Sequence, residues 1–383
     1  MNNDDGLQVV RGTDSDGGPS YELVRDGVPV APFDRFLRFV ADRNMSPNTQ
    51  RAYAYDLRHF MRFLAVEERD WTDFRAQHAP ELLHHLRRVR SSGRPRRAVL
   101  RPVSADGVDA GRLLAASSVH RILAAVASFY EWAIAVGEYA ADSPLQLRPD
   151  EAACRVSDRH QPFTGLSSRQ RPIRRLVGVR RPLRLPRPMA DDDLEELFAS
   201  FRRWRDRAMF LLMLDGGLRP GEVLSLHLDD VSYGRGRVLI AKRDDHPRGA
   251  RGKSRIERLV DLADRRTLDA VNQYVTGERP RQSASPFLFL VGGNRRTSDQ
   301  PLSYDALVRL FARHLDRLGR RTASTTPHAL RHTHATAMWD GGMRELTLQK
   351  RLGHASPEST RIYTRVADSD VLADYRAALE RDQ

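Results

Sequence analysis

The chain has 383 residues, a formal net charge of +13 and a single cysteine, Cys154. This length predicts two domains, and the excess of cations favours a polyanionic partner, most simply nucleic acid. One cysteine excludes an internal disulfide and a thiolate-rich metal cluster, and no apolar run approaches the ~20 residues that span a bilayer. Together these features predict a soluble cytoplasmic protein.

Residues 1–30 are rich in glycine and aspartate and show no clear periodicity. Such a composition is typical of segments that bury little apolar surface. We therefore expect a poorly ordered extension here, with helical patterning from Phe33 onward.

Ser46-Pro47 is a typical helix start, an N-cap followed by proline in the first turn. Apolar side chains then recur on one helical face: Tyr53, Leu57, Phe60 and Leu64. Cationic side chains fall on the other face: Arg51, Arg58 and Arg62. This arginine face is either solvated or lies along a phosphate backbone.

A second helix is predicted from about Ser118 to Val136. Its buried stripe consists of Val119, Ile122, Leu123, Val126, Phe129 and Tyr130. The segment from Arg87 to Arg101 is a basic cluster typical of a loop or helix end. It adds further candidate DNA contacts: Arg94, Arg96 and Arg97. Residues 31–150 are thus predicted to form a small helical DNA-binding domain.

Residues 155–187 hold ten arginines against one acid, and prolines interrupt any helix. High charge with low hydrophobicity predicts disorder in isolation, and a linker that orders on DNA has the same composition. We therefore predict an interdomain linker over residues 151–187. Its candidate phosphate contacts are Arg174, Arg175, Arg180 and Arg181.

Residues 188–383 are predicted to form a second domain that opens with an acidic helix start, DDDLEELF. Two glycines then allow a sharp turn before Arg219-Pro220, which begins a helix. Arg219 would lie where backbone N–H groups point outward, a position suited to a phosphate. GRVLIA and SRIERLV predict two short strands, joined by a loop whose end holds Lys253.

The last sixty residues contain HALRHTHAT from His328, LGHAS around His354, and then Tyr363. One arginine, two histidines and a tyrosine can break a phosphodiester without a metal. Arginine pairs with non-bridging oxygens, and a phenol of pKa about 10 needs cationic surroundings to become a nucleophile. The segment therefore predicts chemistry on DNA.

These motifs resemble those of tyrosine recombinases of the phage integrase and Xer type, including transposases with the same catalytic domain. GLRPGEVLSL resembles the first-arginine motif of that family, GKSRIERLV its lysine motif, and HALRHTHAT its HxxR motif. The resemblance extends over roughly residues 33–367. It implies a set of catalytic residues: Arg219, Lys253, His328, Arg331, His354 and the nucleophile Tyr363.

The resemblance implies a mainly α fold with a small β-sheet. An N-terminal helical core-binding, SAM-like domain would precede a C-terminal α+β catalytic domain. The implied activity is site-specific recombination, as an integrase, transposase or resolvase, through a 3′-phosphotyrosyl intermediate. It would need no metal, ATP or other cofactor, and would act on double-stranded DNA as a homotetramer, with or without an accessory or partner recombinase.

Several alternatives remain open from the sequence. A DNA-binding regulator without catalytic activity would share the fold, and a relaxing topoisomerase would share the chemistry. Lys242 competes with Lys253 as the general acid that would protonate the departing 5′ oxygen. Tyr375 competes with Tyr363 as the nucleophile. The C-terminal tail is a plausible amphipathic helix that packs on its own domain or on a neighbouring subunit.

The histidines of HALRHTHAT also permit a zinc site formed by His328, His332 and His334. The hydrolytic glutamate is absent from this motif, so packing roles are favoured for the latter two. Glu222, one turn after Arg219, would either brace an arginine or form an ordinary salt bridge.

Overall fold

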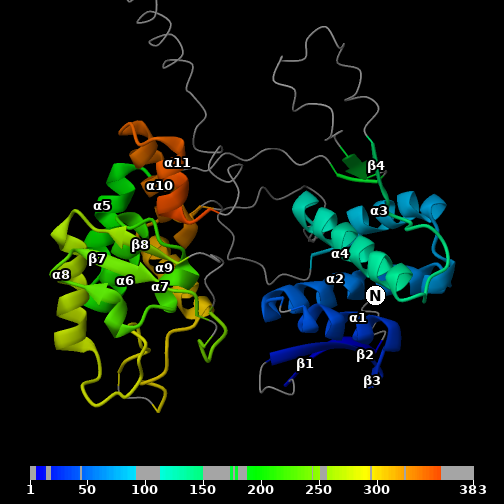
Figure 1. The fold of residues 1–383 in the computed structure, drawn as a ribbon, viewed down its shortest axis with the longest axis horizontal. Coiled ribbons are helices and arrows are strands. Elements are labelled where there is room, and N and C mark those ends of the chain that lie inside the picture. The colour runs from blue at the N-terminus through cyan, green and yellow to red at the C-terminus, as the bar shows by residue number, and fades with distance from the viewer. Residues whose placement is uncertain are drawn as a thin grey trace, which may run out of the picture. The chain divides into compact units, whose positions relative to one another are not determined.

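The computed structural model describes these residues: 6–13, 19–43, 45–91, 113–149, 173–175, 177–179, 188–243, 245–250, 257–293, 296–322 and 325–354. Figure 1 shows two compact units, Met1–Leu183 and Arg184–Gln383. Within the described ranges each unit has its own cluster of buried apolar side chains, formed without residues of the other. The described helices include none that is both long and apolar enough to cross a membrane.

The described helices of the first unit are α1 (Ala31–Asp42), α2 (Pro47–Val66), α3 (Ala79–Arg88) and α4 (Ala116–Ala135). The Ser46 side chain accepts a hydrogen bond from the Thr49 N–H at 3.2 Å, which confirms the predicted start of α2. Every apolar side chain predicted for the stripe of α4 is buried. Phe129 of α4 stacks on Phe33 of α1 with ring centroids 4.5 Å apart, so the two helices share one core.

An antiparallel sheet precedes these helices, with strands in the order β1 (Leu7–Thr13), β2 (Pro19–Arg25) and β3 (Val28–Pro29). It packs against α1 and α2 on one side of the unit (Figure 1). Leu7 and Leu23 are buried in the core of the helical unit.

The expectation of a poorly ordered extension over residues 1–30 is therefore wrong for residues 6–13 and 19–30. Asp26 and Gly27 have φ of 51° and 80°, and this two-residue turn joins β2 to β3. Aspartate and glycine are the residues that such a hairpin turn requires. The composition that suggested disorder belongs in part to a turn between short strands with buried leucines.

The predicted linker also needs correction. Residues 173–175 form β5 (Ile173–Arg175), which pairs antiparallel with β4 (Leu147–Pro149). Val177 is buried in the core of the first unit. The backbone pairing of β5 with β4 and the burial of Val177 attach this part of the predicted linker to the first unit.

The second unit contains a small sheet and several helices. The described helices are α5 (Asp191–Ser200), α6 (Trp204–Leu214), α7 (Pro220–Leu224), the 3-10 turn Leu228–Asp230, α8 (Arg265–Gln273), the π-helical turn Tyr274–Glu278, α9 (Tyr304–Arg317), α10 (Pro327–Asp340) and α11 (Glu345–Leu352). The strands are β6 (Val231–Ser232), β7 (Arg237–Ile240) and β8 (Arg258–Asp261), in an antiparallel sheet of that order. The predicted acidic helix start and the strand predicted from GRVLIA are confirmed. The second predicted strand, SRIERLV, is confirmed from Arg258 onward, and its first three residues lie outside the described residues. Strand β6 was not foreseen.

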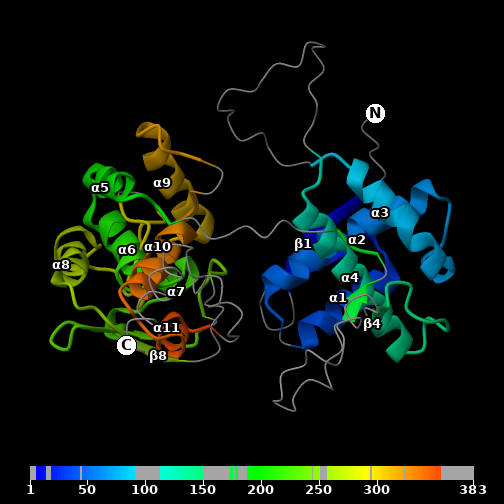
Figure 2. The same cartoon turned by 90° about the horizontal axis from the view of Figure 1, so that it is seen from above.

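Helix α6 is the centre of this unit. Most of its residues are buried, and it contacts α8 and α10. Helix α11 contacts both α10 and β8 (Figure 2). Side chains join the C-terminal ends of α6 and α11 to each other and to the start of α7. Arg351 of α11 donates to the carbonyl of Asp215 after α6, and Arg219 before α7 donates to the carbonyl of Leu352.

Candidate active site

The turn between α6 and α7 positions the first arginine. Gly217 has φ of +63°, and a Cβ there would lie 2.5 Å from Cδ2 of His334, so this close approach requires glycine. Arg219 is the N-cap residue of α7 and Pro220 follows it, as predicted. The Arg219 backbone N–H donates to Oε2 of Glu222 at 2.8 Å. The local backbone thus fixes the position from which the Arg219 side chain extends.

Arg219 and Arg331 meet at the C-terminal end of α11. Arg219 donates to the carbonyl oxygens of Leu352 at 3.2 Å and Gly353 at 3.1 Å. Arg331, from α10, donates to Leu352 at 2.7 Å and to the carbonyl of Gly217 at 2.6 Å. Two guanidinium groups from distant parts of the sequence therefore share one carbonyl oxygen, with 18% and 4% of their side chains exposed.

Glu222 is the counter-ion of this arginine cluster. Its carboxylate accepts from Arg219 at 2.8 Å and from two nitrogens of Arg258 at 3.0 and 2.8 Å, and it lies 3.8 Å from Arg331. Burial alone would raise the pKa of Glu222. The hydrogen bonds and charge of Arg258, with the charges of Arg331 and Arg219, outweigh burial and lower the pKa to about 2. The bracing role for Glu222 is the one that the structure supports.

His354 lies two residues after the end of α11, next to the C-cap Gly353, and belongs to the same cluster. Burial and then the positive charges of Arg331, Arg219 and Arg258 lower the pKa of His354 to about 3. Its ring is therefore neutral at pH 7 and can donate one N–H. The structure thus brings three of the six predicted catalytic residues together: Arg219, Arg331 and His354.

His328 lies in the first turn of α10, one turn before Arg331, and is exposed. Lys253 and Tyr363 lie outside the described residues, as does the rival Tyr375. Lys242, the rival of Lys253, is exposed just after β7, and its backbone N–H donates to Glu257 at 3.3 Å.

His334 has a structural role. Its Nδ1 lies 2.8 Å from the carbonyl oxygen of Leu214, and its Nε2 accepts from Nε of Arg351 at 3.0 Å. Both ring nitrogens are thereby engaged, so the ring has none left for a metal ion. Burial and the charge of Arg351 lower the pKa of His334 to about 4, which keeps the neutral form that this pairing needs.

A cationic face is present on α2 of the first unit. The guanidinium groups of Arg51 and Arg58 lie 5.8 and 5.1 Å from the ring centroid of Tyr55. Burial, followed by positive charges nearby, lowers the pKa of His59 on the same helix to about 4. Arg62 belongs to the same group of charges.

Sequence analysis missed Arg121 of α4, which joins this face through an ion pair with Asp56 of α2 at 2.9 Å. The sequence signal that could have identified Arg121 was its position on the face of α4 opposite the buried stripe. Arg174 and Arg175 lie on β5, where side chains are not described. The other candidate contacts lie outside the described residues: Arg94, Arg96, Arg97, Arg180 and Arg181.

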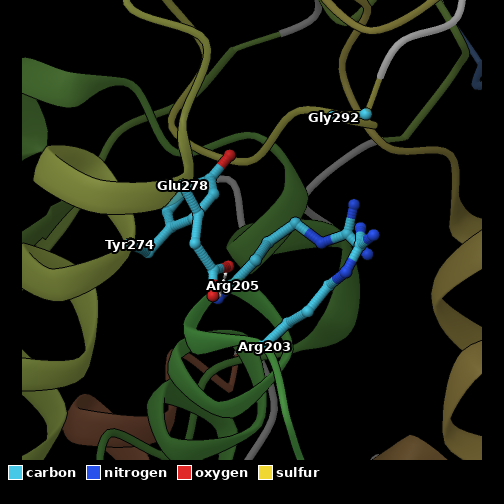
Figure 3. A pocket seen from close by; sticks show the side chains of 6 residues that line it. Arg203, Arg205, Tyr274, Glu278 and Gly292 are labelled. Atoms are coloured by element: carbon cyan, nitrogen blue, oxygen red, sulfur yellow. Dashed lines mark hydrogen bonds between the residues drawn. The ribbon is translucent and has the colours of Figure 1, made fainter.

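A pocket of about 260 Å³ lies at the opposite, N-terminal end of α6, lined by residues that include Arg203, Arg205 and Glu278 (Figure 3). Glu278 accepts from the backbone N–H groups of Trp204 and Arg205 at 2.8 and 3.1 Å. Arg205 is paired with Asp206 at 2.8 Å. These groups stabilise the start of α6, and the pocket lies away from the arginine cluster.

Two family models match the chain. The phage integrase family matches residues 187–370, and the N-terminal SAM-like domain of phage integrases matches residues 33–137. The chain is a tyrosine recombinase of the phage integrase family. The predicted family, fold class and enzyme class, a DNA strand-transferring enzyme that performs site-specific recombination, are thereby confirmed.

Relatives of this recombinase match over nearly its whole length. It is 24% identical over 355 residues to transposase A from transposon Tn554 of Staphylococcus aureus, covering 92% of both chains. It is 28% identical over 343 residues to tyrosine recombinase XerD of Corynebacterium glutamicum, covering 89% of this chain and 94% of the relative.

Solved structures share the fold of this recombinase. The Tn1549 transposon integrase in complex with transposon right end DNA superposes with a TM-score of 0.58 at 16% identity. The match covers 91% of this chain and 98% of that one. The XerH recombinase in a post-cleavage complex with palindromic difH substrate superposes with a TM-score of 0.56 at 16% identity. This match covers 92% of this chain and 84% of that one.

Proposed function

We propose that this recombinase cleaves DNA by attack of Tyr363 on a phosphodiester held between Arg219 and Arg331. The supporting observation is the convergence of both guanidinium groups at the end of α11, one to two residues before His354. Two guanidinium groups that meet at one carbonyl oxygen favour an anion with several acceptor oxygens, such as a phosphate.

Each residue has a distinct role in the proposed step. The two arginines pair with the non-bridging oxygens, where charge increases in the transition state, and neutral His354 donates its N–H to one of them. The phenol proton of Tyr363 passes to His328 as the oxygen–phosphorus bond forms. The bond to the 5′ oxygen breaks, and Lys253 protonates that oxygen. The product is a 3′-phosphotyrosyl ester that keeps the bond energy for rejoining, without ATP.

The DNA partner would contact both units. We propose that the duplex backbone lies along the α2 face of Arg51, Arg58 and Arg62, where neutralised phosphates release counterions. Strand exchange between two duplexes requires several protomers, so the active assembly is proposed to be a homotetramer. The domain arrangement proposed is residues 31–150 for DNA binding and 188–383 for catalysis.

A regulator without catalytic activity would have the same fold. The assembled Arg219, Arg331 and His354 favour catalysis, because two guanidinium groups and a neutral imidazole at one place match the charge that develops on phosphate oxygens in the transition state. Relaxation of a supercoiled plasmid without a specific site would instead support the topoisomerase reading.

The test replaces the scissile phosphate with a methylphosphonate, in which a methyl group removes one non-bridging oxygen and the negative charge. Arg219→Ala should slow single-turnover cleavage of the ordinary diester by roughly 100-fold or more. With the neutral linkage the same variant should cleave close to the wild-type rate, because there is less charge for Arg219 to neutralise.

Arg202→Ala is the matched control, since Arg202 is an exposed cation outside the arginine cluster. It should cleave both substrates as the wild type does. An Arg219→Ala variant that loses the same factor on both substrates would show that Arg219 does not compensate the charge of the phosphate.

A further inference from the structure

Arg258 is a buried arginine that sequence analysis did not single out, with 7% of the residue exposed. It lies on β8, five residues after Lys253. Its Nη1 and Nη2 donate to the two carboxylate oxygens of Glu222 at 3.0 and 2.8 Å, and its Nε donates to the carbonyl of Arg351 at 2.8 Å. One side chain therefore joins β8, α7 and α11.

The last turn of α11 receives three guanidinium groups. The carbonyls of residues 351–353 accept hydrogen bonds from Arg258, Arg219 and Arg331. Carbonyl groups at a helix C-terminus lack partners within the helix and have partial negative charge, so they suit cations. Arg258 binds the same turn that holds the two arginines of the proposed clamp.

We propose that Arg258 is a positioning residue for strand cleavage, which acts by saturating Glu222 so that this carboxylate, which already binds Arg219, does not also draw Arg331 away from the phosphate. This inference rests on the proposed function of the cluster. Arg258 touches no DNA in this scheme and acts through the carboxylate.

The geometry explains why saturation matters. Arg331 lies 3.8 Å from the nearer carboxylate oxygen, beyond a hydrogen bond, while Arg258 occupies both oxygens at 3.0 Å or less. Without Arg258 the buried carboxylate would lose its bidentate partner. The carboxylate would keep Arg219, which it already binds at 2.8 Å, and would draw Arg331 closer, so that it competes with the phosphate for Arg331.

An arginine suits this position better than a lysine. The contacts to Glu222 and to the Arg351 carbonyl use three nitrogens of one planar group. A lysine would keep the charge but could not reproduce this fork. Arg258→Lys should therefore retain part of the function that Arg258→Met loses.

The experiment measures melting temperature, DNA affinity and single-turnover cleavage of a nicked duplex for the full-length variants. Arg258→Met should cleave roughly 100-fold more slowly, because displaced catalytic groups lose their alignment, while DNA affinity stays near the wild-type value. The cleavage rate of Arg258→Lys should fall between those of the wild type and Arg258→Met. Adding Glu222→Gln to Arg258→Met should raise the cleavage rate, since it removes the competing charge.

Arg279→Met is the matched control. Arg279 is equally buried, at 8% exposed, and donates to the carbonyls of Ser285 and Phe287, but it has no contact with the cluster. It should lower the melting temperature without slowing cleavage below that temperature.

The inference fails if Arg258→Met cleaves as fast as Arg279→Met, or if Glu222→Gln deepens the defect of Arg258→Met. If Arg258→Met does not fold, the Arg258→Lys comparison decides in the same way. Either failure leaves the roles of Tyr363 and Arg219 untouched, because those rest on separate variants and substrates.

Discussion

The carboxylate of Glu222 is almost fully buried, with 2% of the residue exposed, yet its pKa lies near 2. Such a value means that the surrounding arginines stabilise the ionised form more than burial destabilises it. The same contacts that fix the arginines therefore make folding depend on the charge of this residue.

We predict that Glu222 contributes stability that is lost in acid. Its pKa is lower in the folded state than the ordinary value of 4.5, so its contribution is complete above pH 4.5 and is lost as the pH falls toward 2. Glu222→Gln lacks this charge. The difference in free energy of unfolding between wild type and Glu222→Gln, measured by urea denaturation, should be largest at neutral pH and should shrink below pH 4.5.

Glu196→Gln provides the comparison, because Glu196 pairs with Arg320 at the surface. Solvent screens such a pair, so this variant should differ little from wild type at any pH. A Glu222→Gln difference that stays constant from neutral pH to pH 3 would contradict the account of the cluster.

At the scale of elements, the turn between α6 and α7 holds the site together. The carbonyl of Gly217 accepts from Arg331, and the left-handed backbone of Gly217 lets His334 pack directly against it. His334 in turn joins α10 to the end of α6 and to α11. The site therefore depends on a glycine as well as on its charged groups.

Gly217→Ala should destabilise the fold by about 1–3 kcal/mol, because the new methyl group enters the space of His334 on a strained backbone. Gly234→Ala is the control, since a Cβ there meets no atom within 4 Å. Thermal and urea unfolding of both variants checks this prediction. Equal stabilities for the two would refute the close packing at Gly217.

Elements with strong local signals were predictable from sequence. The Ser46 cap gave the start of α2, and the spacing of buried residues gave α4. The N-terminal sheet was missed because glycine and aspartate dominated its composition, although Asp26-Gly27 is a hairpin signal. β4 and β5 are short strands far apart in the sequence, so local patterns could not pair them.

The candidate site was predictable only in part. Motif order identified Arg219, Arg331 and His354, and the structure brings them together. Arg258 was not predictable, because a strand arginine in so arginine-rich a chain has no distinguishing local signal. Its importance depends on contacts with α7 and α11 that only the tertiary fold creates.

At the scale of the whole molecule there are two units with separate cores, and we propose that the first binds DNA while the second cleaves it. The first presents cations along α2, and the second gathers arginines around the Glu222 carboxylate and the carbonyl groups at the end of α11. Cations that hold a phosphate do not themselves break a phosphodiester, so cleavage also requires a nucleophile delivered to the cluster. We propose that Tyr363 is this nucleophile.

The most direct measurement is the covalent adduct. Full-length protein is incubated in EDTA with a nicked duplex that carries the target sequence, and a denaturing gel separates protein joined to DNA. Wild type and the matched control Tyr375→Phe should form the adduct, while Tyr363→Phe should bind the duplex without forming it. An adduct with Tyr363→Phe, or one that requires magnesium, would contradict the central claim.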